Sequence, residues 1–390
     1  MDIMEKALKA HEEWGGKLEI NSKVAIKDKE ALSVAYTPGV AKPCLEIQEN
    51  PARSYDLTAR HNLVAVITDG TAVLGLGDIG PLAAMPVMEG KCALFREFAG
   101  VNAFPVCVSS KDPDEFIRTV ELISGSFGGI NLEDISAPRC FEIERRLKKL
   151  LDIPVFHDDQ HGTAIVATAA MLNACKMAGK EMSDLKIVIN GAGAAGVAIA
   201  EMLLSFGVKE ILMLNSKGII CEGDKLTSEA LTSLSQRTNR AKIRGGLAEA
   251  MVGADVFIGV SKPNLVTQDM VCSMNEKPFI FAMANPVPEI MPEDAKAAGA
   301  FVIGTGRSDF PNQINNVLAF PGIFKGALSV RASDITENMK RAAALAIAGC
   351  VSEDQLCPEC VIPNPFDPQV SEAVAKAVAE AAVADGVARI

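Results

Sequence analysis

The stretch at residues 186–207 restricts the possible folds of this chain more than any other. A short β-branched run leads into three glycines with G-x-G-x-x-G spacing, Gly191, Gly193 and Gly196. An apolar segment of helix-forming residues follows and ends at Gly207. Strand, tight turn, helix and helix stop is the order of a dinucleotide-binding βαβ unit. In such a unit the first glycine permits the turn, the second lets the backbone approach a pyrophosphate, and the third lets helix and strand pack closely.

We therefore expect a nucleotide site at this turn, because the helix start offers free N–H groups and a positive dipole end to phosphates. The alternative is a glycine-rich packing turn. The residues expected to carry the pyrophosphate are Gly191, Ala192, Gly193, Ala194, Ala195 and Gly196.

The end of the next predicted strand, 210–214, bears on cofactor choice. An NAD-specific site usually places Asp or Glu there, to bind the ribose 2′-hydroxyl. Here Leu214 is followed by Asn215, Ser216 and Lys217, which can donate hydrogen bonds or a charge to a 2′-phosphate. The pattern favours NADP over NAD, with use of both expected. The alternative is an ordinary polar turn.

A second G-x-G-x-x-G run, Gly75, Gly77 and Gly80, also follows an apolar segment. Pro81 and Pro86 come after it, so the sequence predicts that no long helix begins there. This run is interpreted as a tight loop near a ligand, or simply as a turn.

The bulk composition narrows the class of protein. A length of 390 residues predicts two domains, and the net charge of −11 argues against nucleic acid or an anionic membrane as partner. No apolar run is long enough to span a bilayer, and the N-terminus lacks the features of a signal peptide. The ten cysteines are scattered, and the single C-x-x-C at 357–360 is interpreted as incidental. We expect a cytoplasmic protein.

Strand and helix patterns alternate along the chain, which predicts an α/β protein with parallel sheets covered on both faces. The first domain, 1–160, is expected to hold one parallel sheet, and the second, 161–390, is expected to be a Rossmann NAD(P)-binding domain whose C-terminal helices pack back on the first. The predicted strands are 63–67, 104–108, 129–133, 153–156, 186–190, 210–214, 256–259, 279–283 and 301–304. The predicted helices include 1–13, 28–34, segments starting at Asp112 and near Ser136, 163–176, 334–348 and 371–384.

Acidic residues gather where two predicted strands of the first domain end. Glu133 and Asp134 end one strand, and Asp158 and Asp159 follow the next. Ligands of open parallel sheets bind beyond the carboxyl ends of the strands. Four carboxylates there would repel one another unless a cation lay between them, and oxygen ligands suit Mg²⁺ or Mn²⁺. The alternative is a set of solvated loop acids and helix caps.

Two histidines flank these acids. His157 and His161 are four residues apart, a spacing that suits zinc only if both lie on a helix. Gly162 stands where the next helix is expected to begin, so zinc is disfavoured.

In their order and spacing, these motifs together resemble a malic enzyme over most of the chain. The length resembles the short prokaryotic type, without the appended acetyltransferase-like domain of longer relatives. The motifs are Tyr36-Thr-Pro-Gly-Val, the Gly75–Gly80 loop, Glu89-Gly-Lys91, Asn131-Leu-Glu-Asp134, His157–Thr163, the Rossmann glycines, Asn285-Pro and Asn315-Asn with Phe320-Pro-Gly.

The resemblance implies the oxidative decarboxylation of (S)-malate to pyruvate and CO₂, with reduction of NAD(P)⁺. It implies that Glu133, Asp134 and Asp159 hold Mg²⁺ or Mn²⁺. Asn285 and Asn315 would contact the nicotinamide ribose and the substrate. Similar enzymes assemble at least as dimers, so a homodimer is expected.

The resemblance also assigns the proton-transfer groups. Lys91 would take the proton of the malate hydroxyl, and Tyr36 would protonate the enolpyruvate carbon. Asp158 would support Lys91 or a metal ligand. A lysine serves as a base only if burial or a nearby cation lowers its pKa. Taken alone, Lys91 would be an ordinary surface lysine.

One stretch departs from the family pattern. Larger malic enzymes carry Gly-Glu-Arg before the leucine of the glycine loop, and that arginine binds the substrate carboxylate. Here the stretch is Gly70-Thr-Ala-Val-Leu74, so this contact must come from elsewhere.

Three other functions stay open on the residues alone. One is a two-domain NAD(P)-dependent dehydrogenase of a small acid that does not decarboxylate it. Another is a metallohydrolase built on the His–Asp cluster, and the third is a non-catalytic nucleotide sensor.

Overall fold

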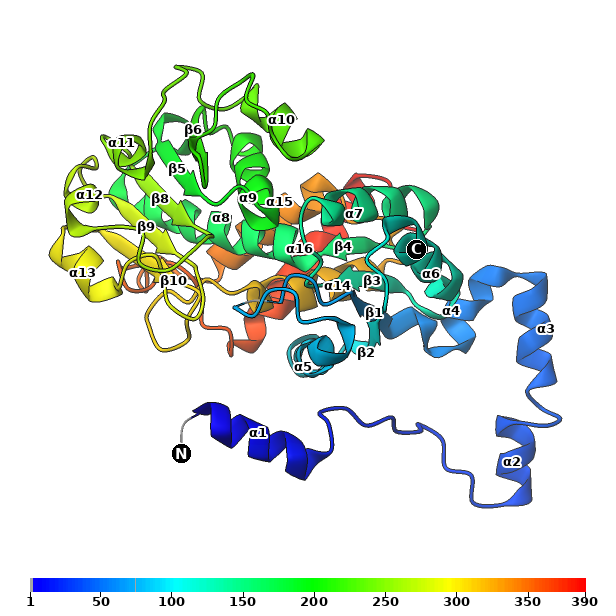
Figure 1. The fold of residues 1–390 in the computed structure, drawn as a ribbon. Helices are drawn as coiled ribbons and strands as arrows, with labels where there is room; N and C mark the ends of the chain where they lie inside the picture. Colours follow the sequence, from blue (N-terminus) through cyan, green and yellow to red (C-terminus); the bar gives the residue numbers. More distant parts are fainter. Residues whose placement is uncertain (1–2, 74) are drawn as a thin grey trace.

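A computed structural model describes residues 3–73 and 75–390, and it contains two sheets (Figure 1). The first sheet is wholly parallel, with strand order β2-β1-β3-β4. Its strands are β1 (Leu63–Thr68), β2 (Asn102–Cys107), β3 (Gly129–Leu132) and β4 (Val155–His157).

The second sheet has six strands in the order β10-β9-β8-β5-β6-β7, all parallel except for β7, which pairs antiparallel with β6. This is the Rossmann-like arrangement that the glycine pattern predicts, so the predicted fold class is confirmed. The strands are β5 (Lys186–Asn190), β6 (Glu210–Asn215), β7 (Gly218–Ile219), β8 (Val256–Gly259), β9 (Phe279–Ala282) and β10 (Val302–Thr305).

Strand β1 shows why the sheet needs a layer of helices on each face. Val64 and Val66 are buried in one hydrophobic cluster, whereas Ala65 and Ile67 are buried in another. Successive side chains of a strand point to opposite faces, so an uninterrupted apolar strand must be covered on both.

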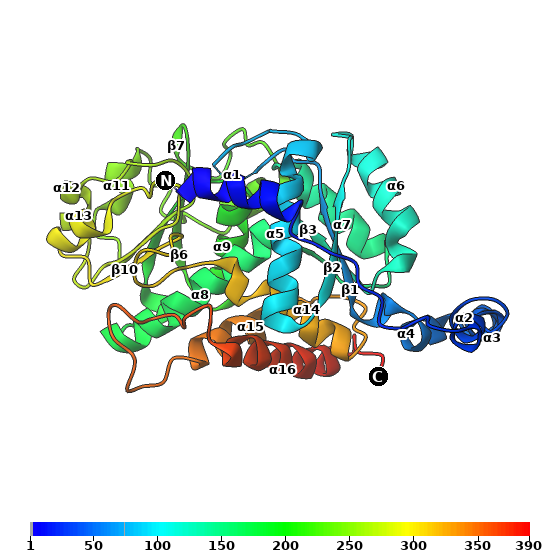
Figure 2. The ribbon, with the colours of Figure 1, turned by 90° about the horizontal axis from the view of Figure 1, so that it is seen from below.

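Helix α8 (Asp158–Ala178) joins the two sheets and packs on α9 (Ala194–Ser205) and on α15 (Glu337–Gly349). It crosses the predicted domain boundary at residue 160. The C-terminal helices α14 (Phe320–Ser329) and α16 (Pro368–Ala384) pack on α5 (Pro81–Ala99) of the first sheet (Figure 2).

The other helices are shorter or lie further from the sheets' junction. They are α1 (Ile3–Trp14), α2 (Lys29–Ala35), α3 (Ala41–Glu49), α4 (Ser54–Leu57), α6 (Pro113–Ile123), α7 (Arg139–Leu150), α10 (Glu229–Ser235), α11 (Leu247–Met251), α12 (Gln268–Cys272) and α13 (Pro292–Ala297). Residues 1–2 of the helix predicted at the N-terminus, and Leu74 of the glycine loop, lie outside the described residues. Within the described part of the chain, no helix combines the length and apolar character needed to cross a membrane.

The prediction that no long helix follows Gly80 is wrong. Helix α5 begins at Pro81, where a proline costs no hydrogen bond, and continues through Pro86 for 19 residues. Met88, Cys92 and Phe95 are fully or almost fully buried along this helix, and that packing outweighs the bond lost at Pro86.

Two other helix starts also differ from the prediction. Helix α8 begins at Asp158, five residues earlier than expected, because its first turn is polar and has no apolar periodicity to mark it. Helix α7 was expected to start near Ser136 and begins instead at Arg139, after the cis peptide bond between Ala137 and Pro138.

Candidate active site

The acidic residues meet at the carboxyl end of the first sheet. Glu133 and Asp134 follow β3, while Asp158 and Asp159 form the first turn of α8, directly after β4. Leu132 and His157 are paired in the parallel register of these strands, so the residues after them must emerge side by side. One carboxylate oxygen from each of Glu133, Asp134 and Asp159 lies within 4.8 Å of the others.

Asp134 is held by its backbone as well as by its neighbours. Its φ of 53° is left-handed, a conformation that non-glycine residues adopt rarely and mostly at special sites. Its N–H donates to Asp159 Oδ2 at 2.8 Å, whereas its own buried Oδ2 has no hydrogen-bond partner. That oxygen is therefore available to a cation.

Burial and mutual repulsion disfavour the charged forms of these acids. Burial, reinforced by Asp159 and Glu133, raises the pKa of Asp134 to about 9. Burial also raises the pKa of Asp158 to about 8, although Lys91 opposes the shift. Burial is also the main cause that raises the pKa values of Glu133 and Asp159. A divalent cation would compensate these charges, and the all-oxygen donor set fits Mg²⁺ or Mn²⁺.

Lys91 lies beside this cluster and is only 7% exposed, in contrast to an ordinary surface lysine. Its Nζ donates to Glu133 Oε1 at 3.1 Å and to Asp158 Oδ2, and lies 3.9 Å from the centre of the Phe320 ring. Burial alone would lower the pKa of Lys91, but Asp158 and Glu133 outweigh it and raise the pKa. A role as base therefore requires that the charge of these two carboxylates be compensated.

Asn316 is a site residue that the sequence analysis missed. Its Nδ2 donates to Asp158 Oδ2, so Asp158 accepts hydrogen bonds from Lys91 and from Asn316 together. The predicted Asn315 instead caps a short 3₁₀ helix, with its Oδ1 accepting from the Val317 N–H at 3.0 Å. The Asn-Asn pair lies near the acids, but sequence alone could not say which amide turns toward them.

The dinucleotide pattern requires a tight turn at its first glycine, an open backbone at its second and close helix–strand packing at its third, and the space around Gly191, Gly193 and Gly196 fits these three requirements. A Cβ on Gly191, whose φ is 130°, would lie 2.6 Å from the carbonyl oxygen of Val260. A Cβ on Gly196 would lie 1.8 Å from the carbonyl oxygen of Gly191. A Cβ on Gly193 would have no heavy atom of the described residues within 4 Å, so the backbone at the start of α9 is open to a phosphate.

The residues after β6 form a tight hairpin. Asn215 pairs with Gly218 across β6 and β7, and Asn215 Oδ1 accepts from the Lys217 N–H at 2.8 Å. Lys217 is exposed. The polar turn named above as the alternative is therefore present, and the Asn215 oxygen is engaged within it.

The loop at Asn285 approaches the first domain. The peptide bond between Asn285 and Pro286 is cis, and a Cβ on Gly75 would lie 3.6 Å from the Asn285 carbonyl oxygen. The Gly75 loop and the loop after β9 therefore meet between the two sheets, as expected for a site shared by both domains.

The stretch that lacks the family arginine lies beside the acids. The Ala72 N–H donates to the Asp134 carbonyl oxygen at 2.9 Å. Arg139 reaches the same stretch from α7, with Nη2 at 2.8 Å from Thr71 Oγ1 and at 2.8 Å from Asp69 Oδ2. An arginine is thus present here, but it is paired with a carboxylate of the chain itself.

Tyr36 is not brought to the site within this chain. It follows α2 and is 66% exposed, and helix α2 lies apart from α5, the helix that carries Lys91, in both views (Figures 1 and 2). The sequence motif carried no signal about the position of Tyr36.

The two histidines do not form a zinc pair. His161 Nε2 lies 2.9 Å from the Glu144 carboxylate, on α7. Burial lowers the pKa of both His157 and His161, which favours their neutral forms. Among the described residues, the group with metal-ligand geometry contains neither histidine.

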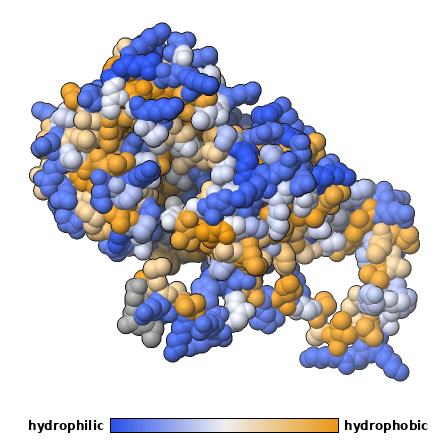
Figure 3. Space-filling model, in the orientation of Figure 1, coloured by the Kyte–Doolittle hydropathy of each residue, from blue (hydrophilic) through white to orange (hydrophobic). Residues whose placement is uncertain are grey.

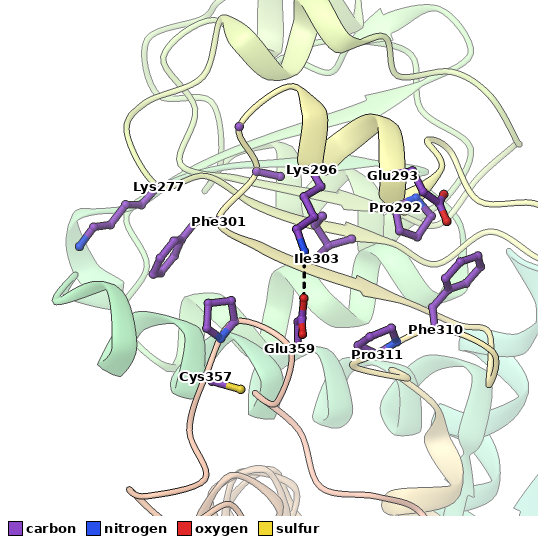
Figure 4. A pocket seen from close by; sticks show the side chains of 13 residues that line it. Lys277, Pro292, Glu293, Lys296, Phe301, Ile303, Phe310, Pro311, Cys357 and Glu359 are labelled. Carbon is purple, nitrogen blue, oxygen red and sulfur yellow. Dashed lines mark hydrogen bonds and ion pairs between the residues drawn. The ribbon is translucent and has the colours of Figure 1, made fainter.

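A separate pocket of about 700 Å³ lies at the outer edge of the second sheet, beside β10 (Figure 4). Lys296 on α13 and Glu359, in the loop between α15 and α16, form an ion pair of 3.0 Å across the pocket. Cys357 also lines the pocket, and its backbone bridges to that of Cys360. None of the proposed site residues lines this pocket.

Comparison with known proteins gives a consistent result over the whole chain. Residues 160–383 match the family model "Malic enzyme, NAD binding domain", and residues 15–112 and 109–148 match "Malic enzyme, N-terminal domain". The bifunctional malic/malolactic enzyme of Bacillus subtilis is 58% identical over 100% of this chain and 95% of its own length. The NAD-dependent malic enzyme of Geobacillus stearothermophilus is 55% identical over 96% and 78%. The crystal structure of malic enzyme from Pyrococcus horikoshii superposes with a TM-score of 0.94 at 47% identity, covering 100% of this chain and 92% of that one.

Proposed function

The chain belongs to the malic enzyme family, which oxidises malate to pyruvate and CO₂ with reduction of NAD or NADP, and on that premise we propose how its own residues do so. One observation carries the proposal. The buried Lys91 donates hydrogen bonds to two carboxylates. Beside it, one oxygen from each of three carboxylates, Glu133, Asp134 and Asp159, lies within 4.8 Å of the others. A non-decarboxylating dehydrogenase would not need three acidic ligands next to its base, and a metallohydrolase would not need the Rossmann turn.

Glu133, Asp134 and Asp159 would hold the metal, with the unpartnered Asp134 Oδ2 as one ligand atom. Mg²⁺ or Mn²⁺ there would offset the carboxylate charge around Lys91 and polarise the substrate's oxygen.

Lys91 would take the hydroxyl proton of malate while the substrate's hydride passes to the nicotinamide. To act as a base Lys91 must be the neutral amine, and Asp158 would orient it, because the Asp158 Oδ2 accepts from Lys91 and from Asn316 together. After CO₂ leaves, Tyr36 would protonate the enolpyruvate carbon. The chain therefore supplies one group for each proton movement.

The open backbone at Gly193 and the N-terminus of α9 would bind the pyrophosphate. Asn285, at the loop between the two sheets, would contact the nicotinamide ribose and the substrate. Asn315 would also contact the substrate, although its Oδ1 is engaged as a cap. We propose that residues 1–160 and 161–390 form the two domains, with α8 continuing across the boundary.

We propose that both cofactors are used, with a preference for NADP. The turn at residues 215–218 carries no carboxylate that would repel a 2′-phosphate, and Lys217 within it is exposed. The Geobacillus stearothermophilus relative is named NAD-dependent, so the proposal includes NAD beside NADP.

A direct assay tests the proposed function. Absorbance of the reduced nicotinamide is followed with malate, Mn²⁺ and each cofactor in turn, and pyruvate is measured in parallel. Lactate is measured too, because the Bacillus subtilis relative is named a malic/malolactic enzyme. Reduced cofactor without pyruvate would favour a dehydrogenase that does not decarboxylate.

We also propose a homodimer in a reducing cytoplasm, consistent with ten free cysteines. Light scattering at low micromolar concentration should give twice the chain mass of 41.2 kDa. A mass of one chain for the active protein would contradict the dimer.

A further inference from the structure

Glu144 places a carboxylate on the face of helix α7 that otherwise packs apolar side chains. The outer face of this helix is charged and exposed, in a mostly hydrophilic region of the surface (Figure 3). On the inner face Ile143 and Leu147 are fully buried, and Glu144 beside them is 7% exposed. A buried carboxylate costs free energy unless its oxygens are hydrogen-bonded, so the groups that it contacts indicate its role.

Among the described residues, the hydrogen-bond partners of the Glu144 side chain all lie at the start of helix α8. Glu144 Oε1 accepts from the His157 N–H at 3.0 Å, and Oε2 accepts from Gln160 Nε2 at 3.3 Å. The His161 Nε2 lies 2.9 Å from the same carboxylate. One side chain of α7 therefore contacts three residues of a single turn.

These contacts enclose two acids of the proposed site. Asp158 and Asp159 lie between the contacted residues, one of which precedes them and two of which follow them. The turn has little room to shift, since a Cβ on Gly162 would lie 2.0 Å from Asp158 Oδ1. Glu144 thus holds the segment from which one proposed metal ligand and one partner of the buried lysine project.

The turn needs to be held because the acids repel one another. After burial, the charge of Asp159 is the largest cause that raises the pKa of Asp134. Repulsion between the end of β3 and the first turn of α8 opposes their approach while no cation lies between them. The hydrogen bonds of Glu144 hold the turn in place from the side of α7.

His161 extends this network to the C-terminal helices. Lys340, on α15, is 2% exposed, and its Nζ lies 3.2 Å from His161 Nδ1. An ammonium group only donates hydrogen bonds and a carboxylate only accepts them, so the neutral imidazole with its proton on Nε2 satisfies both neighbours. The chain Glu144–His161–Lys340 joins α7, α8 and α15.

We propose that Glu144 is a positioning residue of the metal site: through the residues that flank them, it fixes Asp158 and Asp159 in the orientation that the cation requires. The inference rests on the proposed function for the identity of the ligands. It gives the histidine pair a role without zinc, because His157 contributes its backbone N–H and His161 its ring to the support of the turn. Replacing a residue that orients metal ligands typically weakens metal binding by about 10–100-fold.

Titration with Mn²⁺ in the absence of substrate tests the inference. Glu144→Gln keeps the shape of the side chain, but its NH₂ group faces N–H donors where a carboxylate oxygen accepted. Mn²⁺ should therefore bind about tenfold more weakly, or worse. An affinity equal to that of the wild type, together with a lowered Tm, would show that Glu144 serves only the fold and would overturn the inference.

Asp255→Asn is the matched control. Asp255 is also a nearly buried carboxylate, 8% exposed, and it accepts from the Lys186 N–H at 2.9 Å and from Lys180 at 2.8 Å. It precedes β8, at the amino end of the second sheet, so its loss should lower Tm and leave Mn²⁺ binding unchanged. If this variant weakened Mn²⁺ binding as much as Glu144→Gln, general loosening would explain both results and the inference would fall.

A second measurement depends neither on the Glu144 variant folding nor on a metal. The ¹⁵N spectrum of the wild type, labelled at its four histidines, should contain a neutral ring protonated on Nε2 whose signal moves in Lys340→Met. A His161 ring protonated on Nδ1, or on both nitrogens, would contradict the network and overturn the inference. Failure of the proposed function is a separate result, namely a wild type that binds no Mn²⁺ or forms no pyruvate from malate.

Discussion

The Rossmann turn allows one prediction with a built-in comparison, because Gly193 and Gly196 differ so strongly in surroundings. Gly196→Ala would push a methyl group to 1.8 Å from the Gly191 carbonyl oxygen, so β5 and α9 must separate. Gly193→Ala would meet no heavy atom of the described chain within 4 Å, and the backbone at φ −87° accepts an alanine.

The expected magnitudes follow from these contacts. Overpacking of this kind costs about 1–3 kcal/mol in the free energy of unfolding. For a unit of 150–250 residues that lowers Tm by roughly 2–12 °C. Gly193→Ala should leave Tm within about 2 °C of wild type, because surface substitutions without a clash change stability by under about 0.5 kcal/mol. Its methyl group would fill the space in which we propose that the pyrophosphate binds. KM for the dinucleotide should therefore rise at least tenfold, which corresponds to about 1.4 kcal/mol of binding free energy.

The assay combines thermal unfolding with cofactor titration at saturating malate, for both variants and both cofactors. Gly196→Ala should lose stability and cofactor affinity together, whereas Gly193→Ala should lose affinity alone. The reasoning is refuted if Gly193→Ala destabilises the protein as much as Gly196→Ala does, or if it leaves KM for both cofactors unchanged.

Four further predictions concern the proposed site. Chelation of the metal should abolish turnover. Asp159→Asn should weaken Mn²⁺ binding in a titration without substrate, while the fold survives because the amide oxygen still accepts a hydrogen bond from the Asp134 N–H. An unaltered affinity for Mn²⁺ would contradict the role of Asp159 as a ligand. Lys91→Ala should lose about 10²–10⁴-fold in kcat, the range of a positioned acid or base, and a loss below tenfold would remove it from the mechanism. Tyr36→Phe should slow pyruvate formation from malate while sparing reduction of oxaloacetate, so equal losses in both assays would refute its assignment. Lys217→Ala should raise KM for NADP⁺ and leave that for NAD⁺ nearly unchanged, and an equal effect on both would place the lysine outside the cofactor site.

Sequence reasoning was most successful where local chemistry and fold demand the same residue. Asp112 before Pro113 predicted the start of α6, and its side chain does accept from the N–H groups of Asp114 and Glu115. The Rossmann strand, turn and helix appear where the glycine spacing put them. The acids at the ends of β3 and β4 converge, because parallel neighbouring strands must end at one edge.

It failed where packing between distant segments decides the outcome. Pro86 removes one hydrogen bond within α5 but does not end the helix. The packing of Phe95 against Phe320 and Phe324, more than 200 residues away in the sequence, stabilises α5. The turn of Asn316 toward Asp158 depends on the close approach of η5 (Asn316–Leu318) to α8. No pattern near Tyr36 could indicate that its helix would stand apart from the sheets.

Helix α8 gives the molecule a mechanical property of its own. Its first turn carries Asp158 and Asp159, and the helix also packs on α9, which begins after the glycine turn at Gly193. Twenty-one residues make a rod of about 31 Å, so a tilt of about 5° around its first turn moves the far end by about 3 Å. Helix α8 therefore connects the acids at its first turn rigidly to the domain that contains the second sheet. A rotation of that fold that carried α8 with it would therefore also move Asp158 and Asp159.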